Sequence, residues 1–328
     1  MWKFLLRRTL YAVFTVWVIS ILAFAVIQLP PGDYVSDMID DLRAQAGEVS
    51  PEWEAKMREI YGFDDPFIVQ YWKWIKNIIL KGQFGYSFFY KRDAGEMIVE
   101  RLPMSFAISL LSTIFVWTVA LPIGFYSAIR RYSLIDYTAS FVGFVGMAIP
   151  NFLLALIVLL ITYRYMGNAV LGLFSDEYVN APWSWGKFVD LLKHVWVPMV
   201  IIGISSTAGL IRTMRANLLD ELNKPYVETA RAKGLKESRL LIKYPLRHAL
   251  NPFISTIGWM LPGLVSGETI VSMVLNLPTS GPVLYNALVQ QDQYVAAGFI
   301  LMLSTLTVIG TFISDVLLAW VDPRIRLQ

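Results

Sequence analysis

Four uncharged apolar runs limit what this sequence can fold into more than any other feature does. They span residues 9–29, 102–129, 137–163 and 294–314. Each exceeds the roughly 20 residues with which an α-helix crosses about 30 Å of hydrocarbon. Hydrophobic residues make up 56% of the chain and charged residues only 16%, whereas a soluble domain is about 45–50% apolar. The sequence therefore predicts an all-α integral membrane protein.

Two less regular stretches bring the predicted number of transmembrane helices to six. Residues 195–211 contain Pro198, and residues 249–276 contain one acid, Glu268. The basic N-terminus precedes an apolar run that is longer than the core of a signal peptide and has no small-residue cleavage site, so we expect a retained first helix. Residues 1–328 are interpreted as a single membrane domain. The lack of cysteine excludes a disulfide framework and a thiolate metal site.

Charge is distributed unequally between the predicted loops. With a cytoplasmic N-terminus, the inner segments hold 16 Lys/Arg against 6 Asp/Glu, and the outer segments hold 12 against 17. The inner segments are 1–8, 130–136, 212–248 and 322–328, and the outer segments are 30–101, 164–194 and 277–293. Because Lys and Arg accumulate in cytoplasmic loops, both termini are predicted to be cytoplasmic, an N-in/C-in topology.

The first outer segment, residues 30–101, is expected to be an extracytoplasmic insertion with helices of its own. Ser50 and Pro51 favour a helix start, and Gly62 a stop. A second helix is expected from Pro66 to Gly82, rich in aromatic and apolar side chains. Such a helix either lies in the outer membrane interface or packs against the helix bundle.

The segment 212–249 is predicted to be a structured cytoplasmic loop with two short helices. Pro225 favours the start of the first helix, Gly234 favours a left-handed residue at its end, and the second helix begins near Glu237. One interpretation is a basic amphipathic loop lying on anionic lipid. The other is a docking element for a partner protein.

Sequence motifs favour the docking element. Glu228, Thr229, Ala230, Gly234 and the run 242–252 resemble the EAA loop of binding-protein-dependent ABC importer permeases. The spelling YVETARAKGL is similar to the peptide/nickel (oligopeptide/dipeptide) class, in its first-permease type. Further similar stretches are LLRR at 5–8, PPGD at 30–33, GQFGYSF at 82–88, ERLPMSFAISL at 100–110, IPNF at 149–152 and DPRIR at 322–326.

The resemblance implies a type I importer permease fold and a coupling helix that sits in a groove of an ATPase. The implied ATPase-coupling residues are Tyr226, Glu228, Thr229, Ala230, Ala232, Gly234 and Leu235. It also implies partners: a second homologous permease, two ABC ATPase subunits and an extracytoplasmic solute-binding protein, in the cytoplasmic (inner) membrane of a prokaryote. No nucleic-acid partner is expected.

No phosphate-binding loop of the form GxxxxGK[ST] occurs in the chain, so ATP and Mg²⁺ are expected only on the partner subunits. The chain itself is predicted to be a transporter subunit with no enzymatic activity, catalytic residue, metal or cofactor. A membrane-bound enzyme would need a cluster of His, Asp or Glu or an activated nucleophile. An ion-coupled secondary transporter remains the less favoured alternative, and no inverted repeat supports it.

The predicted function is import of oligopeptides by alternating access. The outer segment LNLPTSGPVLYNAL, residues 275–288, departs from the Pro-Gly-Leu-Gly pattern of many relatives, so oligosaccharides or nickel complexes stay open as solutes. A homodimeric or heterodimeric permease pair is equally open. Four residues are candidates for the translocation path or for helix contacts: Glu268, Asp315, Pro150 and Asn151.

Overall fold

Four long helices form the body of the computed structural model, which describes residues 2–28, 65–87, 89–167, 171–251, 253–255 and 269–321. They are α1 (Trp2–Gln28), α5 (Ala94–Ile129), α9 (Trp185–Leu222) and α16 (Gln293–Val321). Each contains a window long and apolar enough to cross a membrane. The predicted helices around 9–29, 102–129, 195–211 and 294–314 are therefore confirmed, although all four extend beyond the apolar runs.

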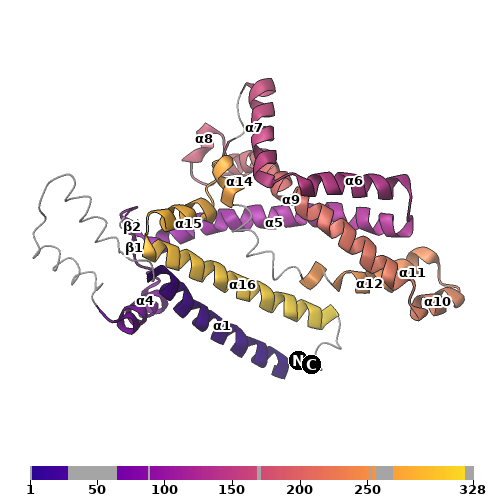
Figure 1. Cartoon of the computed structure of the whole chain (residues 1–328), viewed down its shortest axis with the longest axis horizontal. Helices are drawn as coiled ribbons and strands as arrows, with labels where there is room; N and C mark the ends of the chain where they lie inside the picture. Colours follow the sequence, from indigo (N-terminus) through magenta and orange to yellow (C-terminus); the bar gives the residue numbers. More distant parts are fainter. Residues whose placement is uncertain are drawn as a thin grey trace, which may run out of the picture.

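The third predicted span is wrong as a single helix. It consists of α6 (Leu134–Ala148) and α7 (Asn151–Met166), which meet at an angle of 95°. The break falls at Ile149, whose backbone is extended (φ −89°, ψ 121°), directly before Pro150. A proline ring disfavours the helical conformation of the residue before it, which explains the bend. Figure 1 shows α7 standing away from the direction that the other long helices share.

Six continuous spans are thus not seen. The described residues contain four single helices and the bent pair α6–α7. Half of the predicted fifth span, 249–276, falls outside the described residues. The described part begins at the end of α12 (Pro245–Ala249) and includes α14 (Thr269–Val274).

The helices α5 and α9 pack side by side and form the centre of the molecule (Figure 1). Glycines allow this approach: a Cβ on Gly124 would lie 2.7 Å from the Cβ of Met214, and one on Gly203 would lie 2.9 Å from the ring of Phe115. Met214 and, one turn further along α9, Leu218 are fully buried in a cluster with Ala128 and Phe253. Small residues at the crossing let apolar side chains on either side close the core.

The helix predicted between Pro66 and Gly82 is confirmed as α4 (Phe67–Lys81), and Gly82 ends it with φ +66°. Tyr71 and Trp74 are buried against Phe24 of α1, and the Tyr71 hydroxyl shares a 2.7 Å hydrogen bond with Ser20. The opposite face leaves Trp72 and Ile79 exposed. One side of α4 therefore packs on the bundle, while the other suits the membrane interface. The helix predicted after Ser50 lies outside the described residues.

A short hairpin and α15 (Ser280–Val289) cover the same end of the bundle as α4. The strands β1 (Tyr86–Ser87) and β2 (Arg92–Asp93) are antiparallel, with Tyr86 opposite Asp93. Ser87 donates a 2.5 Å hydrogen bond to Asp292, which directly precedes α16 and is 1% exposed. The hairpin is therefore tied to the start of the last long helix.

The segment before α9 includes the single turn α8 (Asp176–Val179). Here the buried carboxylate of Asp190 accepts two 2.7 Å hydrogen bonds from Ser175, one from its amide and one from its hydroxyl. This contact anchors the segment to the first turns of α9.

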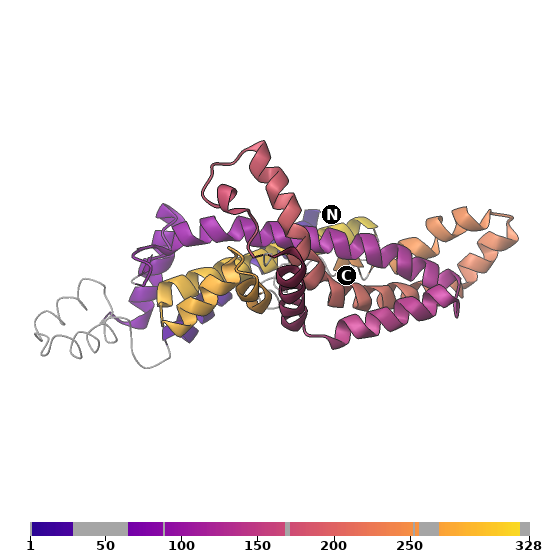
Figure 2. The same ribbon diagram turned by 90° about the horizontal axis from the view of Figure 1, so that it is seen from above.

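The two ends of the molecule carry different elements. Figures 1 and 2 place α10 (Pro225–Ala232) and α11 (Glu237–Lys243) at one tip, opposite α4 and the hairpin. The start of α1, the end of α16 and the turn between α5 and α6 also lie toward the tip with α10 (Figure 1).

Candidate functional site

The loop after α9 is built from three short helices with sharp corners. Pro225 is the first residue of α10 and Glu237 the first of α11, as predicted, and Pro245 begins a separate α12. Gly234 adopts φ +77°, which confirms the predicted left-handed residue. A Cβ at Gly234 would meet nothing within 4 Å, so the backbone conformation, not lack of space, requires glycine there. The predicted loop 212–249 is shorter than expected, because α9 continues to Leu222.

The helix α10 has an inner and an outer face. Val227 and Ala230 are buried against Leu240 and Leu241 of α11. The exposed residues of α10 include Glu228, Thr229 and Ala232. Of the two alanines singled out in the sequence, Ala230 therefore packs within its own chain, and Ala232 is available to another surface. Leu235 is half-buried beside the same cluster.

Tyr226 ties α10 to the end of α9. Its hydroxyl donates a hydrogen bond to Glu221, and its ring lies 5.8 Å from that of His248 in α12. Burial and the neighbouring Glu221 carboxylate raise the pKa of Tyr226 above its ordinary value, so the hydroxyl stays protonated as a donor. These contacts join α10 to the end of α9 and to α12.

An ion pair spans the corner between α10 and α11. The Nη2 atom of Arg231 lies 2.7 Å from Oε1 of Glu237. The hydrogen bond and charge of Arg231 lower the pKa of Glu237. Both side chains are about half exposed, so water and salt screen the pair and its contribution to stability is small.

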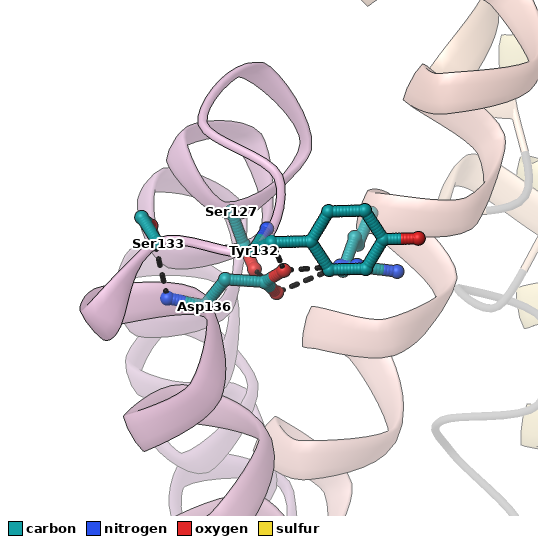
Figure 3. A network of polar contacts seen from close by, with 5 residues as sticks. Ser127, Tyr132, Ser133 and Asp136 are labelled. Atoms are coloured by element: carbon teal, nitrogen blue, oxygen red, sulfur yellow. Dashed lines mark hydrogen bonds and ion pairs between the residues drawn. The ribbon is translucent and has the colours of Figure 1, made fainter.

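A second polar network lies where α5, α6 and α9 meet, and sequence reasoning missed its acid. The carboxylate of Asp136, 3% exposed, accepts hydrogen bonds from Nε (2.7 Å) and Nη2 (2.9 Å) of Arg215. It also accepts one from the Tyr132 amide at 2.9 Å and one from the Ser127 hydroxyl (Figure 3). The sequence signal that could have found Asp136 is its position: it is an acid directly before an apolar run, and it lies in one of the predicted inner segments, which together are rich in Lys and Arg.

The remaining candidates lie apart from the loop. Asp315 forms a 3.1 Å ion pair with Arg8 and so joins α16 to α1. At the bend between α6 and α7, the Asn151 side-chain oxygen accepts a 2.8 Å hydrogen bond from Ser205 of α9. Pro150, Asn151 and Asp315 thus make or flank helix contacts. Glu268 lies outside the described residues.

Nothing in the part of the chain that the structure describes forms a group of three or more His, Asp or Glu side chains able to hold a metal ion.

Comparison with known families decides the class of protein. The family profile described as "Binding-protein-dependent transport system inner membrane component" matches residues 120–327. A second, "Binding-prot-dependent transport system membrane comp, N-term", matches residues 1–109. The chain belongs to this family of transport permeases. The resemblance inferred from the EAA-type loop is confirmed, and the permease is a multi-pass membrane component.

Characterised relatives match this permease nearly end to end. The oligopeptide transport system permease protein AppB of Bacillus subtilis (strain 168) is 36% identical over 324 residues, which cover 98% of this chain and 99% of the relative. The dipeptide transport system permease protein DppB of Escherichia coli (strain K12) is 29% identical over 344 residues, with 99% of each chain covered.

A solved structure supports the fold of the permease. A chain of the MetNI methionine ABC transporter, described as inward facing, superposes with a TM-score of 0.53. The two chains are 18% identical, and the match covers 69% of this permease and 96% of the other chain. At this identity the likeness concerns the fold alone.

Proposed function

We propose that this permease is the membrane subunit of an ABC importer that moves oligopeptides across the cytoplasmic membrane. The observation that carries the proposal is the loop α10–α12, an exposed helical corner fixed to the end of α9 by Tyr226 and Glu221. A short helix held in this way can dock on a partner and pass movement to the bundle. The names of the relatives, oligopeptide and dipeptide permeases, support peptides as the solute.

The mechanism follows from docking of that loop. Two ATPase subunits bind below two permeases, and closure of the ATPases on ATP draws the two α10 helices together. The bundle then alternates between inward-facing and outward-facing states, because ATP binds the two states with different affinity. A solute-binding protein delivers peptide at the opposite side.

This arrangement requires α10–α12 to be cytoplasmic. Two observations support that orientation. The segments 1–8, 130–136 and 212–248 carry the basic excess expected of cytoplasmic loops. The elements that border these segments lie toward one end of the molecule, the end opposite α4 and the hairpin (Figure 1).

The first half of the outer segment that left oligosaccharides open, residues 275–281, is mostly buried. Thr279 is 3% exposed and Ser280 is 1% exposed, and the Ser280 amide donates a 2.8 Å hydrogen bond to Ser105 of α5. The residues that replace the Pro-Gly-Leu-Gly pattern of many relatives thus pack α15 against α5. Their presence is therefore a weak sign of a different solute. Peptides are therefore the preferred solute class.

The proposal is tested by reconstituting the importer with its ATPases and solute-binding protein in proteoliposomes. We expect ATP-dependent accumulation of labelled oligopeptides, and peptides rather than oligosaccharides should titrate the binding protein. Binding of oligosaccharides or nickel complexes alone would refute the peptide assignment. Uptake that proceeds equally in vesicles without ATP would refute the importer itself.

A further inference from the structure

The helix α6 is attached to the rest of the permease in an unusual way. Of its 15 residues only Asp136 and Gly146 are buried, so Asp136 provides the one buried side chain of the helix. Leu134, Tyr137, Phe141 and Phe144 are exposed. The start of α6 is thus held by a charged group and not by apolar packing.

The contact that holds it is directional. Asp136 meets the guanidinium of Arg215 through two parallel hydrogen bonds, and the Tyr132 amide and the Ser127 hydroxyl occupy the remaining acceptor positions (Figure 3). A bidentate carboxylate–guanidinium pair fixes both distance and angle, whereas apolar surfaces can slide. Buried ion pairs are often no more stabilising than apolar residues of the same size, so stability alone is a weak reason for this one.

Arg215 is close to the loop α10–α12 along α9. Seven residues, about two helical turns, separate it from Leu222 at the end of that helix. Leu222 and Phe125 both pack against the cluster of Val227 and Ala230 in α10. The ends of α5 and α9 and the loop therefore form one packed unit, to which Asp136 joins α6.

We propose that Asp136 and Arg215 are a positioning pair that carries movement of the loop α10–α12 into the start of α6. The pair thereby contributes to coupling between ATP hydrolysis and movement of the bent helix pair α6–α7. The inference rests on the proposed function, because it assigns a transmission role within the same importer.

The first test measures solute taken up per ATP hydrolysed by the complete importer in proteoliposomes. Asp136→Asn should lower that ratio about tenfold, the size of effect expected of a residue on a coupling route. Arg215→Lys keeps the positive charge but cannot form two parallel hydrogen bonds, and it should lower the ratio less than Asp136→Asn does.

Asp190→Asn is the matched control. Asp190 is a buried aspartate on the same helix, bonded to Ser175 near the other end of α9, and its replacement should leave the ratio unchanged. If uptake and ATP hydrolysis fall in equal proportion in Asp136→Asn, the residue has a structural role only. The same conclusion follows if Asp190→Asn lowers the ratio as much as Asp136→Asn does.

The second test stays informative when uptake is too low to measure. Because the chain contains no cysteine, spin labels can be placed at Thr138→Cys, exposed in α6, and at Lys233→Cys in the loop. The distance between them should stay constant when a non-hydrolysable ATP analogue binds, and should change with the analogue in Asp136→Asn. A distance that stays constant in both would overturn the inference.

The two proposals fail differently. If Gly234→Pro uncouples the importer while Asp136→Asn does not, the positioning pair is wrong and the importer stands. If the wild-type importer shows no ATP-driven uptake of peptide, the proposed function is wrong.

Discussion

At the scale of single residues, backbone conformation and burial decide which side chains matter. Gly234 is required by its φ of +77° and not by crowding. Gly209, within α9, also has open space around it, yet its backbone is helical. A side chain would fit at both positions, and only at Gly234 would it strain the backbone.

Replacing each glycine by alanine should have opposite effects. Gly234→Ala should destabilise the loop by about 1 kcal/mol, because a left-handed conformation strains an L side chain. Gly209→Ala should be neutral or stabilising by up to about 1 kcal/mol, because alanine favours the helix. Thermal unfolding of the purified permease measures both. Equal effects at the two positions would contradict the role of φ at Gly234.

Asp292 gives a pH-dependent prediction at the same scale. Burial raises the pKa of its carboxyl, against the hydrogen bond from Ser87, which lowers it. A group whose pKa is higher in the folded state favours folding at low pH, and that contribution is lost as pH rises through the folded-state pKa. Asp292→Asn should therefore be at least as stable as the wild type at pH 8.

The difference in stability between the wild type and Asp292→Asn should narrow as the pH falls, because the raised pKa lets the wild-type carboxyl take up its proton more readily in the folded state than in the unfolded chain. Unfolding temperatures measured from pH 4 to pH 8 test this. A variant that is less stable than the wild type at pH 8 would show that the ionised carboxylate is needed at this position.

At the scale of elements, one face of α10 packs within the chain and the other is exposed and can bind a partner. Ala230 is buried against α11, and Ala232 is exposed. The sequence shows two alanines two residues apart in a helix, and this spacing puts them on different faces. Which face is the inner one follows only from the position of Leu240 and Leu241.

Bulky replacements should separate the two faces. Ala230→Leu should lower the unfolding temperature of the permease alone, since overpacking a core costs about 1–3 kcal/mol. Ala232→Leu should leave that temperature unchanged but weaken binding of the ATPase subunits, measured by co-purification. Loss of ATPase binding in Ala230→Leu with normal stability would reverse the assignment of the faces.

At the scale of the whole molecule, two sets of elements lie at opposite ends of the long helices. The loop α10–α12 is at one end, and α4 with the β1–β2 hairpin is at the other (Figure 1). Because the chain is free of cysteine, single cysteines report which side each end faces.

Membrane-impermeant maleimide should label Lys91→Cys, in the hairpin, in intact cells. It should label Lys233→Cys, in the loop, only after the membrane is opened. Both positions are exposed in the structure, so access depends on the side of the membrane. Labelling of Lys233→Cys in intact cells would contradict the N-in/C-in orientation.

The sequence by itself determined the features that depend on local chemistry. Apolar length predicted α1, α5 and α16, the less regular run 195–211 predicted the middle of α9, and proline and glycine predicted the start and the left-handed end of α10. Those signals lie in continuous stretches of the sequence, so they can be recognised without knowing which helices pack together.

The tertiary structure alone decided which residues meet. Asp136 and Arg215 are 79 residues apart, and Arg8 and Asp315 belong to the helices α1 and α16. In an apolar run every face suits lipid, so its pattern does not reveal which face meets another helix. That choice depends on close packing at residues such as Gly124 and on polar groups that find partners only when the helices assemble.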